Sequence, residues 1–218
     1  METLKVSKMK KSIAIIGKGP SVLKSTKELV DSFDEVAICN WPPFDGYEQY
    51  IGSRATYHFI NAGDTIDYER NLLDNLGLKK FFNTQANGNY IQELPDNILP
   101  CHDVEYEWDF GIKTREKYET KYGIWPSTGI MAFDHFLNCD DFNTITLIGF
   151  DFYEAGKSVY YFPKEKAKDS IHYLWNNDSY SIEGTVLDKA YQSHGGNKII
   201  KIINDLIEKS DKKIIWVK

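Results

Sequence analysis

The chain has 218 residues, of which 42% are hydrophobic and 27% charged, and its formal net charge is −6. This size and composition are those of one globular domain with a sizeable core. The acidic balance argues against general nucleic-acid binding, which needs a basic surface. We find no signal-peptide core and no apolar run long enough to span a membrane. Three widely separated cysteines without a CxxC spacing predict reduced thiols in a cytoplasmic protein.

The first motif is a strand, a glycine turn and a helix start. Ser12 to Ile16 is a β-branched run typical of a buried strand, and an amphipathic segment follows from Val22 to Val30. In α/β folds such a turn offers backbone N–H groups and a positive helix end to a phosphate. We therefore predict that the turn forms the floor of a nucleotide site. Its residues are Gly17, Lys18, Gly19, Pro20 and Ser21.

Two further predicted strands each end at an asparagine. The strand over 35–39 is followed by Asn40, and the strand over 55–60 is followed by Asn61. Ligands of an open parallel sheet bind at the carboxyl ends of its strands. An amide there donates to phosphate or ribose oxygens and accepts from a base amine. We therefore assign both asparagines to the nucleotide site.

The second half of the chain carries another anion-binding pattern. A helix is predicted over 66–76, a short strand over 79–82, and irregular structure with one short helix over 83–123. Ser127 and Thr128 then resemble an N-cap pair, and with Gly129 they open a helix that reaches Leu137. A buried strand over 143–148 ends at Gly149 and is followed by Asp151 and Tyr153. The polar, aromatic-rich stretch 154–190 is predicted to be a lid.

A helix from about residue 196 and a last strand over 213–217 complete the pattern. The alternation predicts one domain over 1–218, with a doubly wound, Rossmann-like and mostly parallel sheet. Helices are expected on both faces, together with the small lid region.

Three better-known motifs do not fit. The GxGxxG fingerprint lacks its third glycine, where Val22 stands, and no acidic residue ends the second strand, which argues against NAD. Six residues separate Gly149 from Gly156, whereas a phosphate-binding P-loop has four, and no helical pattern follows. No D-x-D triplet occurs, so we expect neither a metal site nor a cofactor.

Four segments, in matching order, resemble the sialyltransferases, above all the bacterial enzymes of glycosyltransferase family 42 and more distantly the animal enzymes of family 29. The segments are IAIIGKGPS, Cys39-Asn40 with Asn61, PSTGIMAFDHFL with TITLIGFDFYEAG, and Tyr191 to His194 with Asn197. The resemblance implies transfer of sialic acid or a related keto-sugar acid from a CMP-activated donor to a glycan. It also implies inversion and no required metal.

The same resemblance implies roles for individual residues. His194 would be the general base, with His172 as its rival. The hydroxyls of Tyr153 and of Tyr160 or Tyr161 would stabilise the leaving phosphate. The remaining residues would hold CMP and the donor carboxylate. They are Gly17 to Ser21, Asn40, Asn61, Ser127, Thr128, Gly129, Gly149 and Asp151.

The chain also departs from the family pattern. Lys18 replaces an amide between the two glycines, and Trp125 stands where the bacterial pattern has an arginine. The donor sugar therefore stays open between sialic acid, Kdo and a relative, and the acceptor is expected to be a glycan of the lipooligosaccharide or capsule type. Either a monomer or a homo-oligomer is compatible with the sequence. Two alternatives stay open: another Rossmann-like transferase (methyltransferase or pyrophosphokinase type) and a catalytically silent nucleotide- or carbohydrate-binding protein.

Overall fold

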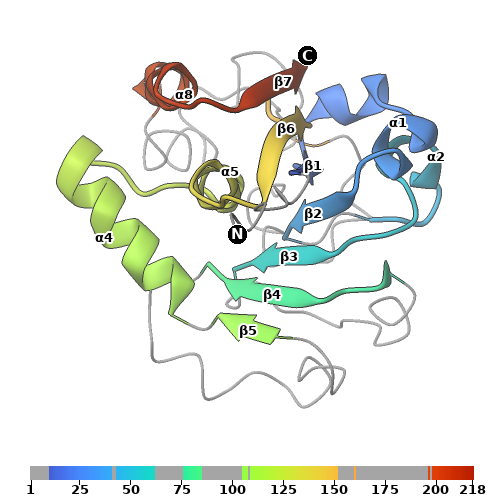
Figure 1. Ribbon diagram of the computed structural model, residues 1–218, viewed down its shortest axis with the longest axis horizontal. Coiled ribbons are helices and arrows are strands. Elements are labelled where there is room, and N and C mark those ends of the chain that lie inside the picture. The colour runs from blue at the N-terminus through green and yellow to red at the C-terminus, as the bar shows by residue number, and fades with distance from the viewer. Residues whose placement is uncertain are drawn as a thin grey trace, which may run out of the picture.

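The computed structural model describes residues 10–40, 43–61, 76–84, 105–107, 109–151, 160, 196 and 198–218. These residues contain a seven-stranded sheet in which all neighbouring strands are parallel, in the order β5-β4-β3-β2-β1-β6-β7 (Figure 1). The strands are β1 (Lys11–Ile16), β2 (Glu35–Cys39), β3 (Tyr57–Ile60), β4 (Lys80–Asn83), β5 (Glu105–Glu107), β6 (Phe142–Ile148) and β7 (Lys213–Val217).

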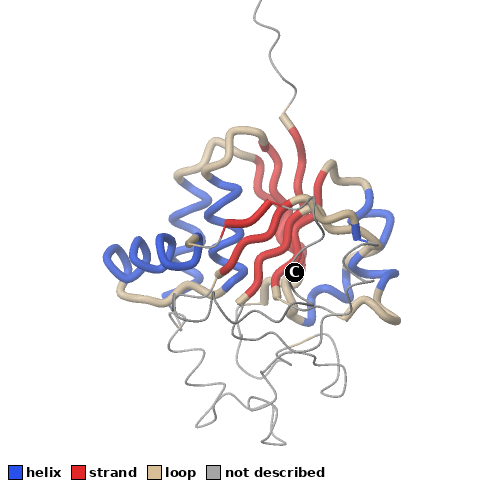
Figure 2. The backbone as a smooth tube through the Cα atoms, turned by 90° about the horizontal axis from the view of Figure 1, so that it is seen from below, coloured by secondary structure: helices blue, strands red, loops and turns tan. Residues whose placement is uncertain are grey.

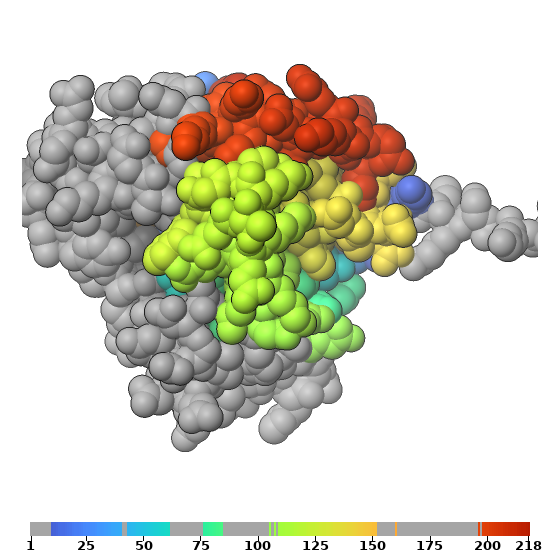
Figure 3. Space-filling view, turned by 90° about the vertical axis from the view of Figure 1, so that its left-hand side faces the viewer, coloured from blue at the N-terminus to red at the C-terminus, as the bar shows by residue number. Residues whose placement is uncertain are grey.

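Helices cover both faces of the sheet, as the edge-on view of Figure 2 shows. The two faces separate two apolar clusters, because Ile13 and Ile15 of β1 point to one cluster and Ala14 and Ile16 to the other. One face is covered by α4 (Phe110–Tyr122), α5 (Thr128–Leu137) and α8 (Lys198–Glu208). The other is covered by the 3-10 turn η1 (Pro20–Lys24), α1 (Lys27–Asp31) and α2 (Glu48–Ile51). In Figure 3, α4 and α8 form the outer layer of the first face.

The strand order reverses beside β1. The chain runs outward from β1 through β2, β3, β4 and β5, and then crosses back so that β6 pairs with the free side of β1. Ligands of doubly wound sheets bind at the carboxyl ends of the strands at this switch point. The fold therefore directs attention to the loops that follow β1 and β6.

The predicted doubly wound parallel sheet is confirmed, and the structure corrects two of its details. The segment from Val22 to Val30 is not one helix, because η1 ends at Lys24 and α1 begins only at Lys27. Thr26 caps α1 by accepting a hydrogen bond from the Leu29 N–H (3.2 Å), so the Ser25-Thr26 pair interrupts the helical pattern. The region predicted to be irregular also contains β5, in addition to its helix α4.

Two predictions fall largely outside the described residues. They are the helix over 66–76, of which only Leu76 is described, and the lid over 154–190, of which only Tyr160 is described. No helix among the described residues is long and apolar enough to cross a membrane.

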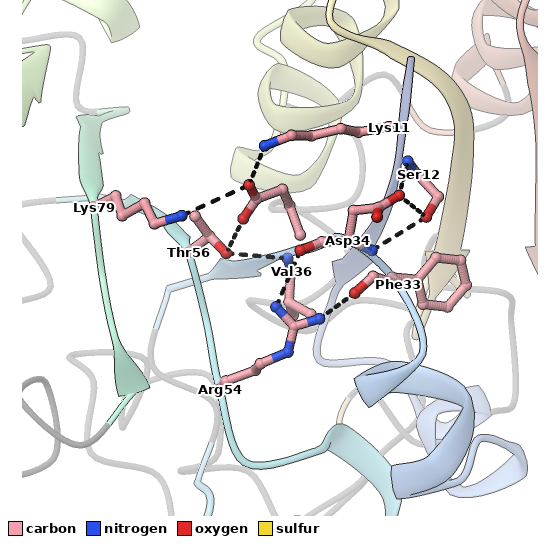
Figure 4. Close-up of polar contacts among 9 residues, drawn as sticks. Lys11, Ser12, Phe33, Asp34, Val36, Arg54, Thr56 and Lys79 are labelled. Atoms are coloured by element: carbon pink, nitrogen blue, oxygen red, sulfur yellow. Dashed lines mark hydrogen bonds and ion pairs between the residues drawn. The ribbon is translucent and has the colours of Figure 1, made fainter. Parts of the chain in front are cut away.

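The amino ends of β1, β2 and β3 are joined by a polar network (Figure 4). Glu35 at its centre is buried; its carboxylate accepts hydrogen bonds from Lys11 Nζ (2.7 Å) and Thr56 Oγ1 (2.6 Å). Asp34 accepts from both the N–H and the hydroxyl of Ser12 (2.7 and 2.8 Å). Both carboxylates thus tie strands together at the edge opposite the switch point, which agrees with our rejection of a ribose-binding acid here.

Burial alone would raise the pKa of Glu35. The hydrogen bonds from Lys11 and Thr56 and the charges of Lys11 and Lys79 outweigh burial, so the pKa lies below its usual range. A carboxyl group whose pKa is lowered by folding stabilises the fold when it is ionised. Its contribution is complete above the unfolded-state pKa, near 4.5, and is lost as the pH falls through the lower folded-state pKa.

We predict that Glu35→Gln lowers the free energy of unfolding by about 1.5 kcal/mol near pH 7, because a charge-assisted hydrogen bond is lost. Urea denaturation of both proteins at several pH values measures this difference. It is expected to persist down to about pH 4.5 and to shrink below that pH. Glu116→Gln, on the exposed side of α4, is the control and is expected to change little at any pH. A Glu35→Gln difference that does not vary with pH would contradict the assignment.

Candidate functional site

The carboxyl ends of four strands bring most of the predicted site residues to one edge of the sheet. Gly17 follows β1, Asn40 follows β2, Asn61 follows β3 and Gly149 follows β6. Ser127, Thr128 and Gly129 join them because α5 packs against β1, β2, β3 and β6. The structure therefore brings together the segments that the sequence analysis placed at the carboxyl edge of the sheet.

The loops after β1 and β6 are in direct backbone contact. Gly17 N–H donates to the Ile148 carbonyl (2.7 Å), and Gly19 N–H donates to the Gly149 carbonyl (2.9 Å). A Cβ atom on Gly17 would lie 2.5 Å from the Gly149 oxygen, and one on Gly19 would collide with Asp151. Gly149 also has a φ of 74°, in the region that favours glycine. Glycine is thus required at these positions because the backbones of the two loops lie so close together.

Asp151 holds the start of η1 in place. Its Oδ2 accepts hydrogen bonds from both the N–H and the hydroxyl of Ser21, each at 2.9 Å. The N–H groups of Gly17, Gly19 and Ser21 therefore all donate within the chain, and Pro20 has none. We expected these amides to face a phosphate. In this structure they hold the loop against the segment after β6, and the Lys18 side chain lies buried against the Tyr160 ring.

Asn40 is the best-fixed polar residue of this edge. It is the only described non-glycine residue with positive φ (54°), and its N–H donates to the Phe59 carbonyl (2.7 Å). Its Oδ1 accepts from the Asn61 N–H (3.1 Å) and from Thr128 Oγ1 (3.2 Å). These two donors assign the orientation of the amide. The oxygen of the amide is thus used within the protein, and among the described residues no hydrogen bond from Asn40 Nδ2 is found.

His58, which sequence analysis missed, holds the backbone of Asn40. The ring is fully buried in β3, and its Nε2 donates to the Asn40 carbonyl (2.7 Å). Burial lowers the pKa of His58 to about 4, against the effect of this hydrogen bond, so the ring is neutral at pH 7. The signal was a histidine in an otherwise apolar strand. It marks a positioning residue here.

The first turn of α5 faces the same edge. Ser127 is the N-cap, but its side chain makes no capping hydrogen bond, and the first intrahelical bond is from Met131 N–H to the Ser127 carbonyl (3.0 Å). A Cβ atom on Gly129 would lie 2.9 Å from Phe150, so glycine lets the helix start close to the loop after β6. The first-turn N–H groups and the positive end of the helix dipole therefore lie beside Asn40 and Phe150, at the carboxyl edge of the sheet.

The end of β4 adds two residues that sequence analysis did not assign. Asn83 ends this strand, is 1% exposed and is paired in register with Ile60. Thr84 follows, and its hydroxyl lies 3.1 Å from Thr128 Oγ1. The signal was present, because Asn83 repeats the asparagine pattern of the two preceding strands.

Of the residues predicted to take part in the reaction, only Tyr160 lies among the described residues. Tyr153, Tyr161 and His194, with the rival base His172, lie outside the described residues. Tyr160 is described and buried, and its ring centroid lies 4.6 Å from Lys18 Nζ. Among the described residues no group of three or more His, Cys, Asp or Glu side chains is placed to hold a metal ion.

Trp125 precedes the N-cap of α5 and is 49% exposed. The Arg115 guanidinium of α4 lies 3.3 Å from the centroid of its ring. Where the resemblance places an arginine, the chain therefore has a tryptophan with an arginine stacked on it.

No protein-family profile and no curated protein matches the chain. Several solved structures do match. The sialyltransferase CstII from Campylobacter jejuni, in complex with cytidine-5′-monophosphate, superimposes with a TM-score of 0.59 at 17% identity, covering 97% of this chain and 81% of that one. Cst-I, a monofunctional α-2,3-sialyltransferase from the same organism, gives 0.57 at 19% identity, with coverage of 100% and 79%. A mammalian sialyltransferase gives 0.53 at 16% identity, with coverage of 94% and 69%. The chain therefore has the fold of the sialyltransferases, as its sequence motifs predicted.

Proposed function

We propose that the chain is a glycosyltransferase that transfers sialic acid or a related keto-sugar acid from a CMP-activated donor to a glycan. The observation that carries the proposal is the amide of Asn40, fixed through its oxygen at the carboxyl end of β2, next to the switch point between β1 and β6. CstII, which shares the fold, has been solved with CMP and with a trisaccharide acceptor and CMP.

The described donors suit the two anionic groups of such a substrate. Asn40 and Asn61 would donate to ribose or phosphate oxygens, since they lie at adjacent strand ends. Ser127, Thr128 and Gly129 at the start of α5 would receive the donor carboxylate, because a helix N-terminus favours negative charge. Gly149 and Asp151 would act indirectly, by holding the loop after β1 against the loop after β6.

In the proposed reaction an acceptor hydroxyl attacks the anomeric carbon of the donor, and configuration inverts. His194 removes the hydroxyl proton, since a histidine near its ordinary pKa is suited to general base catalysis. The bond between the anomeric carbon and the phosphate oxygen breaks, and its electron pair leaves with CMP. The hydroxyls of Tyr153 and of Tyr160 or Tyr161 would donate to that phosphate. No metal or cofactor has a role in this scheme.

The acceptor is proposed to be a glycan of the lipooligosaccharide or capsule type, and the reaction to take place in the cytoplasm. Neither the linkage formed nor the oligomeric state enters this proposal.

We predict that CMP raises the melting temperature of the protein without magnesium, because a ligand that binds only the folded state stabilises it by mass action. At one hundred times its dissociation constant the gain is about 2.7 kcal/mol. Differential scanning fluorimetry with CMP, CDP, UDP, ATP, S-adenosylmethionine and NAD, each with and without magnesium, makes the comparison. A shift for another nucleotide and none for CMP would refute the proposal, and a shift for S-adenosylmethionine or ATP would favour the methyltransferase or pyrophosphokinase alternative.

We predict that Asn40→Asp weakens CMP binding by at least about tenfold, as measured by isothermal titration calorimetry. Aspartate keeps an oxygen for the Thr128 hydroxyl and the Asn61 N–H, tolerates the left-handed backbone, and removes the two N–H donors. The fold is therefore expected to survive the change. Asn138→Asp at the end of α5 is the matched control. Unchanged CMP affinity in Asn40→Asp would remove Asn40 from the site.

We predict that His194→Ala lowers the rate of sugar transfer by about a hundredfold or more, with CMP affinity nearly unchanged, because a general base acts in the transition state. Steady-state kinetics and calorimetry separate the two effects. His172→Ala is the matched comparison. If that variant alone loses activity, the base has been assigned to the wrong histidine. If both variants bind CMP and CMP-activated donors yet the wild-type protein transfers nothing, the chain is a silent binding protein.

A further inference from the structure

Lys18 is a buried cation at the carboxyl edge of the sheet. It lies in the turn between β1 and η1, and only 8% of its surface is exposed. Lysine is rarely buried this far, because its charge loses hydration. Its Nζ lies 4.6 Å from the centroid of the Tyr160 ring, within the range of a cation–π interaction.

The surroundings fix where this charge sits. The Tyr160 ring is part of the apolar cluster that contains Ile16, Val22 and Ile148, so it forms a firm wall on one side of the ammonium. Burial raises the pKa of the Cys39 thiol to about 12, and the charge of Lys18 acts against this shift. Cys39 is the last residue of β2 and precedes Asn40. The ammonium therefore lies against the Tyr160 ring, near enough to the end of β2 for its charge to act on Cys39.

We propose that Lys18 is a catalytic residue that binds the phosphate of the CMP-activated donor and stabilises the charge that develops on it during transfer. This inference rests on the proposed function and adds a cationic group to it. The neutral donors Asn40 and Thr128 lie at the same edge.

The chemistry requires more from the phosphate contact as the reaction proceeds. The donor phosphate is a diester with one negative charge. When the bond to the anomeric carbon breaks, the electron pair stays on the phosphate oxygen and CMP leaves as a dianion, while the acceptor proton goes to the base. A fixed cation attracts the second charge as it forms, which lowers the barrier more than it strengthens ground-state binding. Low exposure reduces screening by water and strengthens the attraction.

Calorimetry with CMP and cytidine tests this assignment, because the two ligands differ only in the phosphate. Lys18→Met is expected to weaken CMP binding about tenfold or more and to leave cytidine binding within about twofold. Lys18→Arg keeps the charge and is expected to retain most of the CMP affinity. Since the second pKa of a phosphate monoester is near 6, wild-type protein should bind CMP more tightly at pH 7.5 than at pH 5, and Lys18→Met should lose most of this difference.

Transfer kinetics provide the second readout. Lys18→Met is expected to lower kcat about a hundredfold, a larger factor than its loss of CMP affinity, because the second charge exists only after bond breaking begins. If Lys18→Met does not fold, as judged by its thermal transition, Lys18→Gln carries the same expectations.

Equal losses of CMP and cytidine affinity would overturn the assignment, because they would show a general disturbance of the site. Unchanged CMP affinity in Lys18→Met would overturn it directly. Failure of the proposed function has a different signature, since the wild-type protein would then bind neither CMP nor cytidine while remaining folded.

Discussion

The site depends on the direct backbone contact between the loops after β1 and β6. Two strands that pair in the sheet normally diverge where their loops begin, because side chains separate them. Here glycines at 17 and 149 remove the side chains, so hydrogen bonds continue from Gly17 to Ile148 and from Gly19 to Gly149 beyond the strands. The same contact fixes η1, because Ser21 donates two hydrogen bonds to Asp151 in the loop after β6. It thereby fixes the backbone on either side of Lys18.

Asn40 extends this order across the rest of the edge. Its backbone is held by His58 and Phe59 of β3, and its side-chain oxygen joins the end of β3 to the start of α5 through Thr128. A residue in a left-handed conformation is strained and persists only when its surroundings hold it. The groups that hold Asn40 use its side-chain oxygen and its backbone. Asn40 thus joins the ends of β2 and β3 to the start of α5.

The sequence was most informative where local patterns decide the structure. Short apolar runs located β1, β2, β3 and β6, and the residues after them were assigned to the correct edge of the sheet. The helix predicted from Val22 failed because Ser25 and Thr26 offer the backbone hydrogen bonds that compete with a helix. The internal use of the glycine-loop amides could not be predicted either. It depends on the carbonyls of Ile148 and Gly149 and, for Ser21, on the carboxylate of Asp151, 130 positions away. These contacts follow only from the strand order.

The described carboxyl edge of the sheet carries hydrogen-bond donors and a positive charge. Its amides, hydroxyls and helix N–H groups donate hydrogen bonds, and Lys18 adds a positive charge. The carboxylate of Asp151 has its Oδ2 engaged by two donors from Ser21. The carboxylates of Asp34 and Glu35 lie at the other edge, where they join strands. This division of charge agrees with the substrate that we propose, because a CMP-activated sugar acid carries two anionic groups close together. An acidic residue in place of Lys18 would put a negative charge beside Tyr160, and we expect it to weaken binding of the anionic donor that we propose.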